Sequence, residues 1–299
     1  IFHFLLPFHM RKEAFDIWIE SFTPPFSTSC LQLYTKKPVI GLVHMLSAED
    51  MNRKYKLPFH IVEEQGLKTY RYLLAITEST NAKLMRLNRK AKTFVIPNGI
   101  YLRTASQNRN HLQNQDANYI FCIGRLEINQ KGLDLLLAAY SLMSKKTKAK
   151  LVIAGSGLPL AEKTLRDKIK RYKLEDRVVL TGRVGSVQKA ELYQNASVVV
   201  VPSRHETFGI VVLEAMSYGK PVVSFDIEGL QWTPRQSVVK AKAFDHHDLA
   251  ESLYQTLTDK DLRSAMAAAS EEAITEYSWD KVAQRYRAVI REVLKESRK

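Results

Sequence analysis

The stretch that most constrains the fold runs from residue 203 to residue 223, and an apolar run precedes it. Four consecutive valines, 198–201, closed by Pro202, are typical of a strand buried on both faces of a parallel sheet. A second apolar run follows at 221–225, and residues 209–218 between the two runs have the length of a helix, with Gly219 as its C-terminal stop. The stretch therefore predicts a strand-loop-helix-strand unit of an α/β fold. Residues 204–207 then lie at the carboxyl end of a strand, where open α/β sheets bind ligands.

Two glutamates in this stretch are candidate binding groups. Glu206 lies in the predicted loop, and Glu214 lies within the helix among apolar neighbours. Because a buried carboxylate needs a partner, a ligand with two adjacent hydroxyls, such as a ribose, is one candidate for satisfying both oxygens of Glu214. The free amides at the start of the helix, near 208–210, favour an anion. The alternative is a surface position for Glu206 and a lysine or arginine partner for Glu214.

Residues 205–223, with two glutamates eight positions apart, closely resemble the signature of the large retaining glycosyltransferase family often called family 4. Upstream segments resemble the same family in the right order: 123–126 with 131–132, 154–157 and 180–184. The match is specific from residue 96 onward and weak before it. The resemblance implies an α/β GT-B architecture, in which two Rossmann-like domains with parallel sheets face a cleft and the C-terminal domain holds most of a nucleotide-sugar donor.

The resemblance also implies a set of site residues. Arg125 and Lys131 fall in the loop between a predicted strand, 119–123, and a predicted helix, 133–143, so both can reach one anion. Each charge-assisted contact to phosphate is worth roughly 1.5 to 3 kcal/mol. The implied catalytic residues are Glu206, Arg125, Lys131 and His44, and the implied donor-binding residues are Glu214, Gly209, Ile210, Phe208, Thr207, Arg183, Val184, Gly155 and Asn98.

The activity implied is transfer of a sugar, with retention, from a nucleotide diphosphate sugar to a hydroxyl of a glycan or lipid-linked acceptor. Uridine donors are the commonest in the family. Arg125, Lys131 and the helix start near Gly209 would stabilise the charge that builds on the β-phosphate, so we expect neither a metal nor another cofactor. Glu206 would hold sugar hydroxyls, and His44 would approach the sugar from the other domain. Arg125→Ala is expected to lower turnover by roughly 100-fold.

The domain organisation expected from this resemblance has four parts. Residues 1–103 form an N-terminal acceptor domain, 104–117 a polar linker, 118–278 the donor-binding domain, and 279–299 a helix that returns to the first domain. No glycine-rich turn precedes Phe15, so the first domain is expected to be short or truncated. A chain lacking its first βα units and a naturally reduced acceptor domain both explain this.

Apolar runs and helical patterns predict further elements in both domains. The predicted strands are 15–19, 39–43, 73–77, 93–96, 151–154 and 178–181, and the predicted helices are 61–72, 79–88, 162–173, 249–257, 262–273 and 277–299. Two acidic clusters, 245–248 and 259–261, resemble metal-binding patterns but precede predicted helices. We expect helix capping from both and no metal site.

The chain is strongly basic, with a net charge of +14, and residues 1–110 carry 16 Lys and Arg against 8 Asp and Glu. Such a field attracts anionic membrane or phosphorylated substrates, and no nucleic-acid motif accompanies it. Two cysteines and no long apolar run predict a cytoplasmic protein, with possible peripheral contact with the inner face of a membrane. The rival hypotheses are a catalytically weak GT-B protein that binds a nucleotide sugar and contacts a membrane through its basic face, and a nucleic-acid binder.

Overall fold

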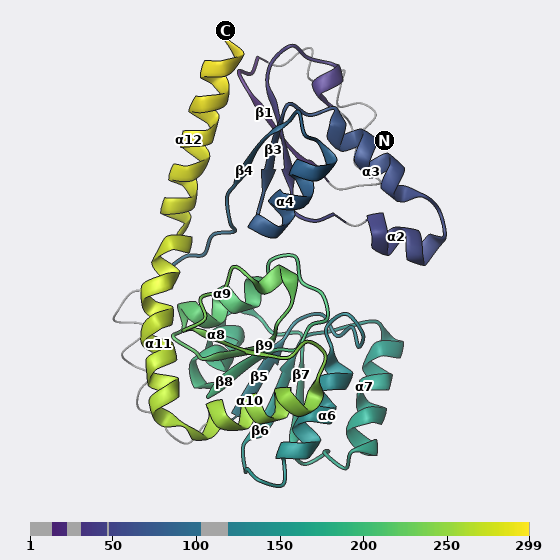
Figure 1. Ribbon diagram of the computed structural model, residues 1–299. Coiled ribbons are helices and arrows are strands. Elements are labelled where there is room, and N and C mark those ends of the chain that lie inside the picture. Colours follow the sequence, from purple (N-terminus) through teal and green to yellow (C-terminus); the bar gives the residue numbers. More distant parts are fainter. Residues whose placement is uncertain (1–13, 23–30, 47, 103–118, 299) are drawn as a thin grey trace. The chain divides into compact units, whose positions relative to one another are not determined.

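The computed structural model describes residues 14–22, 31–46, 48–102 and 119–298, and these fall into two compact units. Unit 1 comprises Ile1–Gly99 and Trp279–Lys299, and unit 2 comprises Ile100–Ser278. Figure 1 shows that each unit has its own parallel sheet with helices against it. The predicted linker, 104–117, lies outside the described residues.

Unit 1 is built on a four-stranded parallel sheet with the order β1-β2-β3-β4. Its strands are β1 (Trp18–Phe22), β2 (Val39–Val43), β3 (Tyr72–Ala75) and β4 (Lys92–Val95), and its helices are η1 (Leu31–Leu33), α2 (Ala48–Tyr55), α3 (Phe59–Lys68), α4 (Glu78–Leu87) and α12 (Trp279–Ser297). Neighbouring strands of a parallel sheet need crossover connections, and α2, α3 and α4 lie in them.

The two faces of this sheet bury different side chains, as the two-residue period of a strand requires. Val39, Val43 and Leu73 lie in one apolar cluster, with residues of the loops and of α3 and α4. Ile40 and Leu74 lie in the other, with three valines of the last helix: Val282, Val289 and Val293. Helix α12 therefore completes the core of unit 1, although it is separated from the rest of the unit by all of unit 2 in the sequence.

Unit 2 has a six-stranded parallel sheet with the order β10-β9-β8-β5-β6-β7. The strands are β5 (Tyr119–Ile123), β6 (Lys150–Ala154), β7 (Val178–Gly182), β8 (Val198–Val201), β9 (Val222–Phe225) and β10 (Val238–Ala241). The helices are α6 (Leu133–Met143), α7 (Pro159–Arg171), α8 (Ser186–Asn195), α9 (Ile210–Ser217), α10 (His246–Thr258) and α11 (Lys260–Ile274), with short 3₁₀ turns η2 (Glu228–Leu230) and η3 (Thr275–Tyr277).

The strand order of unit 2 reverses between β5 and β8. The chain adds β6 and β7 on one side of β5 and then places β8, β9 and β10 on the other side. Loops that follow β5 and β8 therefore leave the sheet in opposite directions and open a crevice between them, which is where open α/β sheets bind ligands. The predicted site residues Arg125 and Lys131 follow β5, and Glu206 follows β8.

Two predicted bounds in unit 1 are wrong. The strand predicted at 15–19 is β1, Trp18–Phe22, because pairing in register with β2 aligns Trp18 with Val39. The helix predicted at 61–72 is α3, which ends at Lys68. The side-chain amide of Asn88 donates hydrogen bonds to the carbonyl oxygens of Leu67 and Tyr70 (2.8 and 2.9 Å), which holds this segment in a turn before β3. The apolar spacing continues through that turn, which explains the error.

Candidate active site

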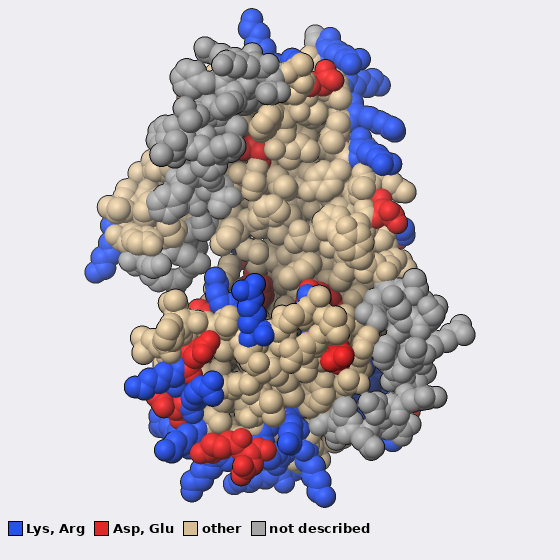
Figure 2. Space-filling model, turned by 180° about the vertical axis from the view of Figure 1, so that it is seen from behind, with Lys and Arg blue, Asp and Glu red and all other residues tan. Residues whose placement is uncertain are grey.

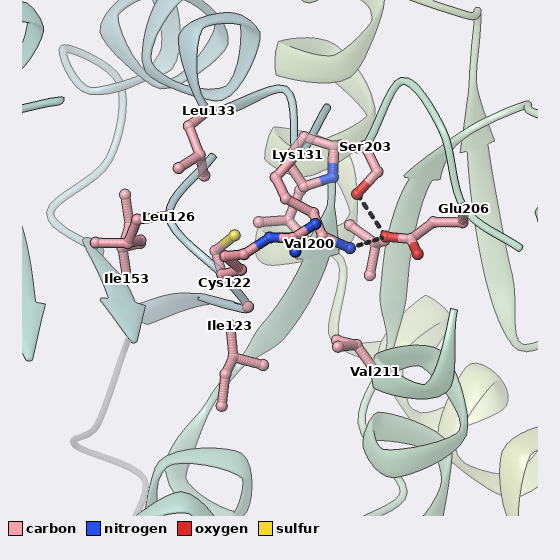
Figure 3. Close-up of a pocket in the computed structure, with 14 residues that line it drawn as sticks. Cys122, Ile123, Leu126, Lys131, Leu133, Ile153, Val200, Ser203, Glu206 and Val211 are labelled. Carbon is pink, nitrogen blue, oxygen red and sulfur yellow. Dashed lines mark hydrogen bonds and ion pairs between the residues drawn. The ribbon is translucent and has the colours of Figure 1, made fainter. Parts of the chain in front are cut away.

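The centre of the crevice in unit 2 is an ion pair between the two loops. Lys131 Nζ lies 2.7 Å from Glu206 Oε1, and Ser203 Oγ donates a hydrogen bond of 2.7 Å to the same oxygen. Figure 3 shows the three side chains converging from the loops after β5 and β8. The side chains of Lys131 and Glu206 are only 23% and 13% exposed. Glu206 Oε2 has no hydrogen-bond partner among the described residues, so this oxygen is open to a ligand hydroxyl.

The pocket around this pair is mostly apolar. Figure 3 shows its lining, which includes Ile123, Leu126, Leu133, Ile153, Val200 and Val211. Burial raises the pKa of the Cys122 thiol, which also lines the pocket, to about 12. The sulfur is therefore protonated at neutral pH and is not a nucleophile there. An apolar wall strengthens the electrostatic interactions of Lys131 and Glu206 relative to those in water.

A wider hollow adjoins the pocket and collects residues from three loops. It is lined by Ile123, Gly124, Arg125, Gly155, Ser156, Gly157, Leu158, Arg183, Val184 and Lys189. Arg125 is exposed and donates a hydrogen bond of 3.0 Å to Gln130 Oε1, which leaves most of its guanidinium donors available. Three cationic side chains thus line one hollow, an arrangement that suits a ligand with more than one negative charge.

Backbone contact between loops shapes this hollow. A Cβ atom on Gly155 would lie 1.8 Å from the carbonyl oxygen of Gly124, and Gly155 has φ +138°, a conformation that other residues rarely adopt. The amide of Gly124 in turn donates to the carbonyl of Ala154 (3.0 Å). Glycine at 155 therefore lets the loops after β5 and β6 pack backbone against backbone, beside Arg125.

Glu214 is satisfied by protein side chains. Lys189 Nζ lies 2.6 Å from Glu214 Oε1, and Tyr193 OH donates a hydrogen bond of 2.8 Å to Oε2. Burial, and then the Glu214 charge beside it, raises the pKa of Tyr193 well above its usual value, so the phenol stays protonated and donates. The expectation that a ligand supplies both partners of Glu214 is thus corrected, and the alternative of a lysine partner is confirmed. Each oxygen keeps a further lone pair, so a ribose hydroxyl can still bind there.

A second ion pair ties the two central loops together. Arg204 donates two hydrogen bonds of 2.8 Å to the carboxylate of Asp134, at the start of α6, and a third to the carbonyl of Asn129. Burial by itself would raise the pKa of Asp134, but the Arg204 hydrogen bonds and charge lower it below its usual value. A bidentate pair has a fixed geometry, so this pair orients the loop that carries Lys131 relative to the loop that carries Glu206.

Residues 207–209 directly precede α9, and Ile210 is its first residue. The side chains of these four residues differ in role from their backbone amides. Phe208 is 2% exposed, so its ring is part of the core and only its backbone is accessible to a ligand. Gly209 is the N-cap residue of α9, with φ +74°. Thr207 is half-buried and Ile210 is exposed. The assignment of these amides to a phosphate stays a prediction.

The structure places two predicted site residues in unit 1. His44 directly follows β2 and is exposed, and partial desolvation lowers its pKa, so the imidazole is neutral at pH 7. Asn98 is half-buried and follows β4 by three residues. The roles of His44 at the sugar and of Asn98 at the donor stay predictions, and all other predicted site residues lie in unit 2.

Sequence reasoning missed several residues of the site. Ser203, Asp134, Lys189 and Tyr193 hold the predicted groups in place, and none of them was among the predicted site residues. Lys189 and Tyr193 lie on α8, a helix that was not predicted. Their spacing of four residues on one helix was the available signal, because such residues lie on one face and can reach one carboxylate.

Both acidic clusters cap helices, as predicted. The Asp245 side chain accepts hydrogen bonds from the amides of His247 and Asp248, and the Asp259 side chain accepts one from the amide of Leu262. Within the described residues, no group of three or more His, Cys, Asp or Glu side chains is arranged to hold a metal ion. No helix of the described residues is long and apolar enough to cross a membrane.

Comparison with known proteins identifies the fold of this chain. The fold is that of GT-B glycosyltransferase structures: sucrose-phosphate synthase from Thermosynechococcus elongatus is similar over 99% of this chain and 78% of that chain, with a TM-score of 0.82 and 22% identity. Anabaena HepE in complex with UDP-glucose is similar over 97% of this chain and 82% of that one, with a TM-score of 0.79 and 17% identity.

Residues 104–273 match the family model described as glycosyl transferases group 1, and the chain belongs to this family. A curated relative, the D-inositol 3-phosphate glycosyltransferase of Xylanimonas cellulosilytica, is 31% identical over 191 residues, which are 63% of this chain and 45% of the relative. Matches to the first curated relatives span less than half of their length.

Proposed function

We propose that this protein is a retaining glycosyltransferase that moves a sugar from a nucleotide diphosphate sugar to a hydroxyl of a glycan or lipid-linked acceptor. The observation that carries the proposal is the Lys131 and Glu206 ion pair at the point where the strand order of unit 2 reverses. Glu206 presents one open oxygen there, beside a hollow lined by three cations. Family membership supports the same reaction class.

Lys131 and Arg125 would stabilise the leaving group in this reaction. As the bond between the sugar C1 and the phosphate oxygen breaks, its electron pair goes to the β-phosphate, and charge builds there. Lys131 is already oriented by Glu206, and Arg125 by Gln130, so both stabilise that charge with little reorganisation. We propose that these fixed cations replace a metal ion at the diphosphate.

Other residues of unit 2 fit the nucleotide. Arg183 and Val184 lie in the hollow where we propose that the base binds, and Glu214 would accept hydrogen bonds from the ribose hydroxyls. A uridine donor is favoured by analogy with HepE, whose structure contains UDP-glucose. Glu206 Oε2 would hold a sugar hydroxyl, and His44 is proposed as a further contact of the sugar.

Retention follows if the acceptor attacks from the face that the phosphate leaves. The acceptor oxygen then forms its bond to C1 while the C1 bond to phosphate breaks, and the acceptor proton passes to the departing phosphate oxygen. Cys122 stays protonated, and Glu206 Oε1 is held by Lys131 and Ser203. The protonated thiol disfavours a covalent intermediate on Cys122, and we assign the open Oε2 of Glu206 to a sugar hydroxyl and not to attack at C1.

The experiment that tests this proposal follows the fate of the donor. The full chain is incubated with UDP-glucose, UDP-N-acetylglucosamine, UDP-galactose, GDP-mannose and ADP-glucose, with and without simple glycoside acceptors and with EDTA. We expect one donor to be consumed in the presence of EDTA, with an α-configured product from an α-configured donor. Consumption of none of these donors, or a β-configured product, contradicts the proposal.

Glu214→Gln is expected to weaken nucleotide binding about 10- to 100-fold, because a charged hydrogen-bond acceptor at the ribose is lost. Turnover at saturating donor should change little, since the ribose does not change charge during transfer. Isothermal titration with the nucleoside diphosphate and steady-state kinetics measure the two effects. Glu191→Gln is the matched control, an exposed acid on the neighbouring α8, and should leave both unchanged. Equal affinity of Glu214→Gln and wild type excludes the ribose assignment.

A specific surface supports a second role, contact with an anionic membrane. Three exposed basic residues of α12 are spaced four residues apart, which puts them on one face of the helix: Arg287, Arg291 and Lys295. A fourth exposed basic residue, Arg298, lies in the turn directly after α12. Figure 2 shows basic side chains in a column along the edge formed by α12. None of the four forms an ion pair with a described residue.

The acids between them are already used within unit 1. Lys92 forms ion pairs with both Glu292 and Glu296, and these hydrogen bonds raise the pKa of Lys92 to about 12. The basic column on α12 and the turn after it (Arg287, Arg291, Lys295 and Arg298) therefore keeps its charge. Each basic residue near an anionic bilayer contributes about 1 kcal/mol. This column supports the alternative function, a nucleotide-sugar-binding protein held at a membrane, as well as a transferase that works on lipid-linked acceptors.

Arg291→Gln with Lys295→Gln is expected to lower partitioning onto vesicles of phosphatidylcholine with 30% phosphatidylserine by about 10- to 30-fold, because two cations are lost. Sedimentation with vesicles at 100 mM salt measures this. Lys163→Gln with Arg166→Gln, an equal loss of exposed charge on α7, is the control and should bind like wild type. Equal losses for both double variants indicate a non-specific charge effect and contradict the role of α12.

A further inference from the structure

The segment after β9 packs against the loop that carries Glu206. This segment contains η2 and reaches Trp232. A Cβ atom on Gly229 would lie 1.8 Å from the carbonyl oxygen of Glu206, so the two backbones are in direct contact. The shape of the 206–209 loop is therefore constrained by residues 229–232, which belong to neither central loop.

Trp232 holds residue 208 in two ways. Its indole ring stacks on the Phe208 ring, with centroids 4.4 Å apart and planes 7° from parallel. Its indole Nε1 also donates a hydrogen bond of 2.6 Å to the carbonyl oxygen of Phe208. The side chain and the backbone of one loop residue are thus fixed by one side chain.

Trp232 is itself supported from another side. The ring of Tyr277 lies 5.0 Å from the Trp232 ring, and the carbonyl of Tyr277 accepts a hydrogen bond of 2.8 Å from the amide of Ile100. The carbonyl of Leu230 accepts hydrogen bonds from Thr233 Oγ1 (2.8 Å) and Lys240 Nζ (2.9 Å). The indole is therefore held rigidly as a donor, because Tyr277 contacts its ring and two hydrogen bonds anchor the backbone at Leu230.

The hydrogen bond to the Phe208 carbonyl fixes the next amide. A peptide group is planar and trans, so its C=O and N–H point in opposite directions. Holding the Phe208 oxygen toward Trp232 therefore directs the Gly209 N–H away from Trp232. Gly209 is the N-cap residue of α9, and its N–H has no partner among the described residues. An oriented, unpaired amide beside Glu206 is a donor available to an anion.

We propose that Trp232 is a positioning residue: it orients the Gly209 amide and thereby sets the affinity of the site for a diphosphate. The inference rests on the proposed function, because it assumes that the site binds a nucleoside diphosphate. It also makes a prediction about the loop alone. Without Trp232, the 206–209 loop should open more often, whether or not a nucleotide is present.

Two variants of the full chain separate the two contacts. Trp232→Phe keeps a ring for stacking and loses the indole donor, whereas Trp232→Leu loses both. We expect amide hydrogen exchange in peptides covering 204–211 to accelerate about tenfold in Trp232→Leu, and less in Trp232→Phe. Isothermal titration should show UDP affinity falling about tenfold in Trp232→Leu with UMP affinity nearly unchanged, because only the diphosphate reaches the Gly209 amide. If GDP or ADP is the nucleotide bound, the corresponding pair replaces UDP and UMP.

Tyr119→Leu is the matched control. Like Trp232, Tyr119 is a half-buried aromatic residue of unit 2, and its hydroxyl donates a hydrogen bond of 2.7 Å to the carbonyl oxygen of Leu192. Tyr119 is the first residue of β5, whereas the site loop follows the last residue of that strand. The proposal is overturned if Trp232→Leu and Tyr119→Leu change exchange at 204–211 equally, or if the ratio of diphosphate to monophosphate affinity stays constant. If exchange accelerates but no nucleotide binds to wild type, positioning by Trp232 is supported and the proposed function fails.

Discussion

Lys131→Met should lower donor turnover by about 100- to 1,000-fold, the loss typical of removing one preorganised donor at a developing negative charge. Methionine has nearly the length of lysine and lacks its charge. The change removes the cation from the leaving phosphate, and it also leaves Glu206, whose side chain is 13% exposed, without its ion-pair partner. Kinetics with the donor identified from the panel, at saturating concentration, measures the effect.

The double variant Lys131→Met with Glu206→Gln separates catalysis from folding. Removing one partner of a buried pair destabilises by several kcal/mol, whereas removing both is often nearly neutral. We therefore expect the double variant to recover most of the thermal stability that Lys131→Met loses, with no recovery of turnover. Turnover of Lys131→Met within twofold of wild type contradicts the role of Lys131 in transfer.

Gly155→Ser should destabilise unit 2 by about 3 kcal/mol or more and abolish nucleotide binding. The new Cβ would lie 1.8 Å from the carbonyl oxygen of Gly124, and the residue has φ +138°. Strain of the backbone alone is worth about 1 to 3 kcal/mol, and the overlap with Gly124 adds to it. Thermal unfolding followed by circular dichroism, with nucleotide titration of the folded protein, measures both losses.

Gly185→Ser makes the same chemical change at a site without constraint. Nothing lies within 4 Å of a Cβ atom on Gly185, and this residue is the N-cap of α8, where serine is favoured. We expect its melting temperature to equal or slightly exceed that of wild type. If both serine variants melt alike, backbone packing between Gly155 and Gly124 does not shape the site.

The central strands of the two sheets are the elements that the sequence predicts best. The bounds of β2, β5 and β8 follow from apolar runs that end at polar residues or proline, and each is buried in a sheet interior. The edge strand β10, with sequence Val-Val-Lys-Ala, was missed. Its apolar run is two residues long, and only pairing with β9 makes it a strand.

The sequence predicted the charged residues of the candidate site but missed the residues that hold them in place. Lys131 and Glu206 stand in loops after strands, and loop position plus family resemblance is enough to single them out. Tyr193 and Trp232 lie outside the motifs and contact them only in the folded structure. Phe208 shows the same limit, since its ring stacks in the core and only its backbone faces the site.

Thermal unfolding of the full chain with UDP, GDP and ADP, each at 1 mM and near-physiological salt, tests whether unit 2 binds a nucleotide. A ligand at 100 times its dissociation constant adds about 2.7 kcal/mol to the folded state. For a unit of this size, that corresponds to a rise in melting temperature of about 5 to 10 °C. We expect such a rise with one of the three nucleotides, and its loss in the double variant Lys131→Met with Glu214→Gln. No rise with any of them contradicts a nucleotide-sugar site in unit 2.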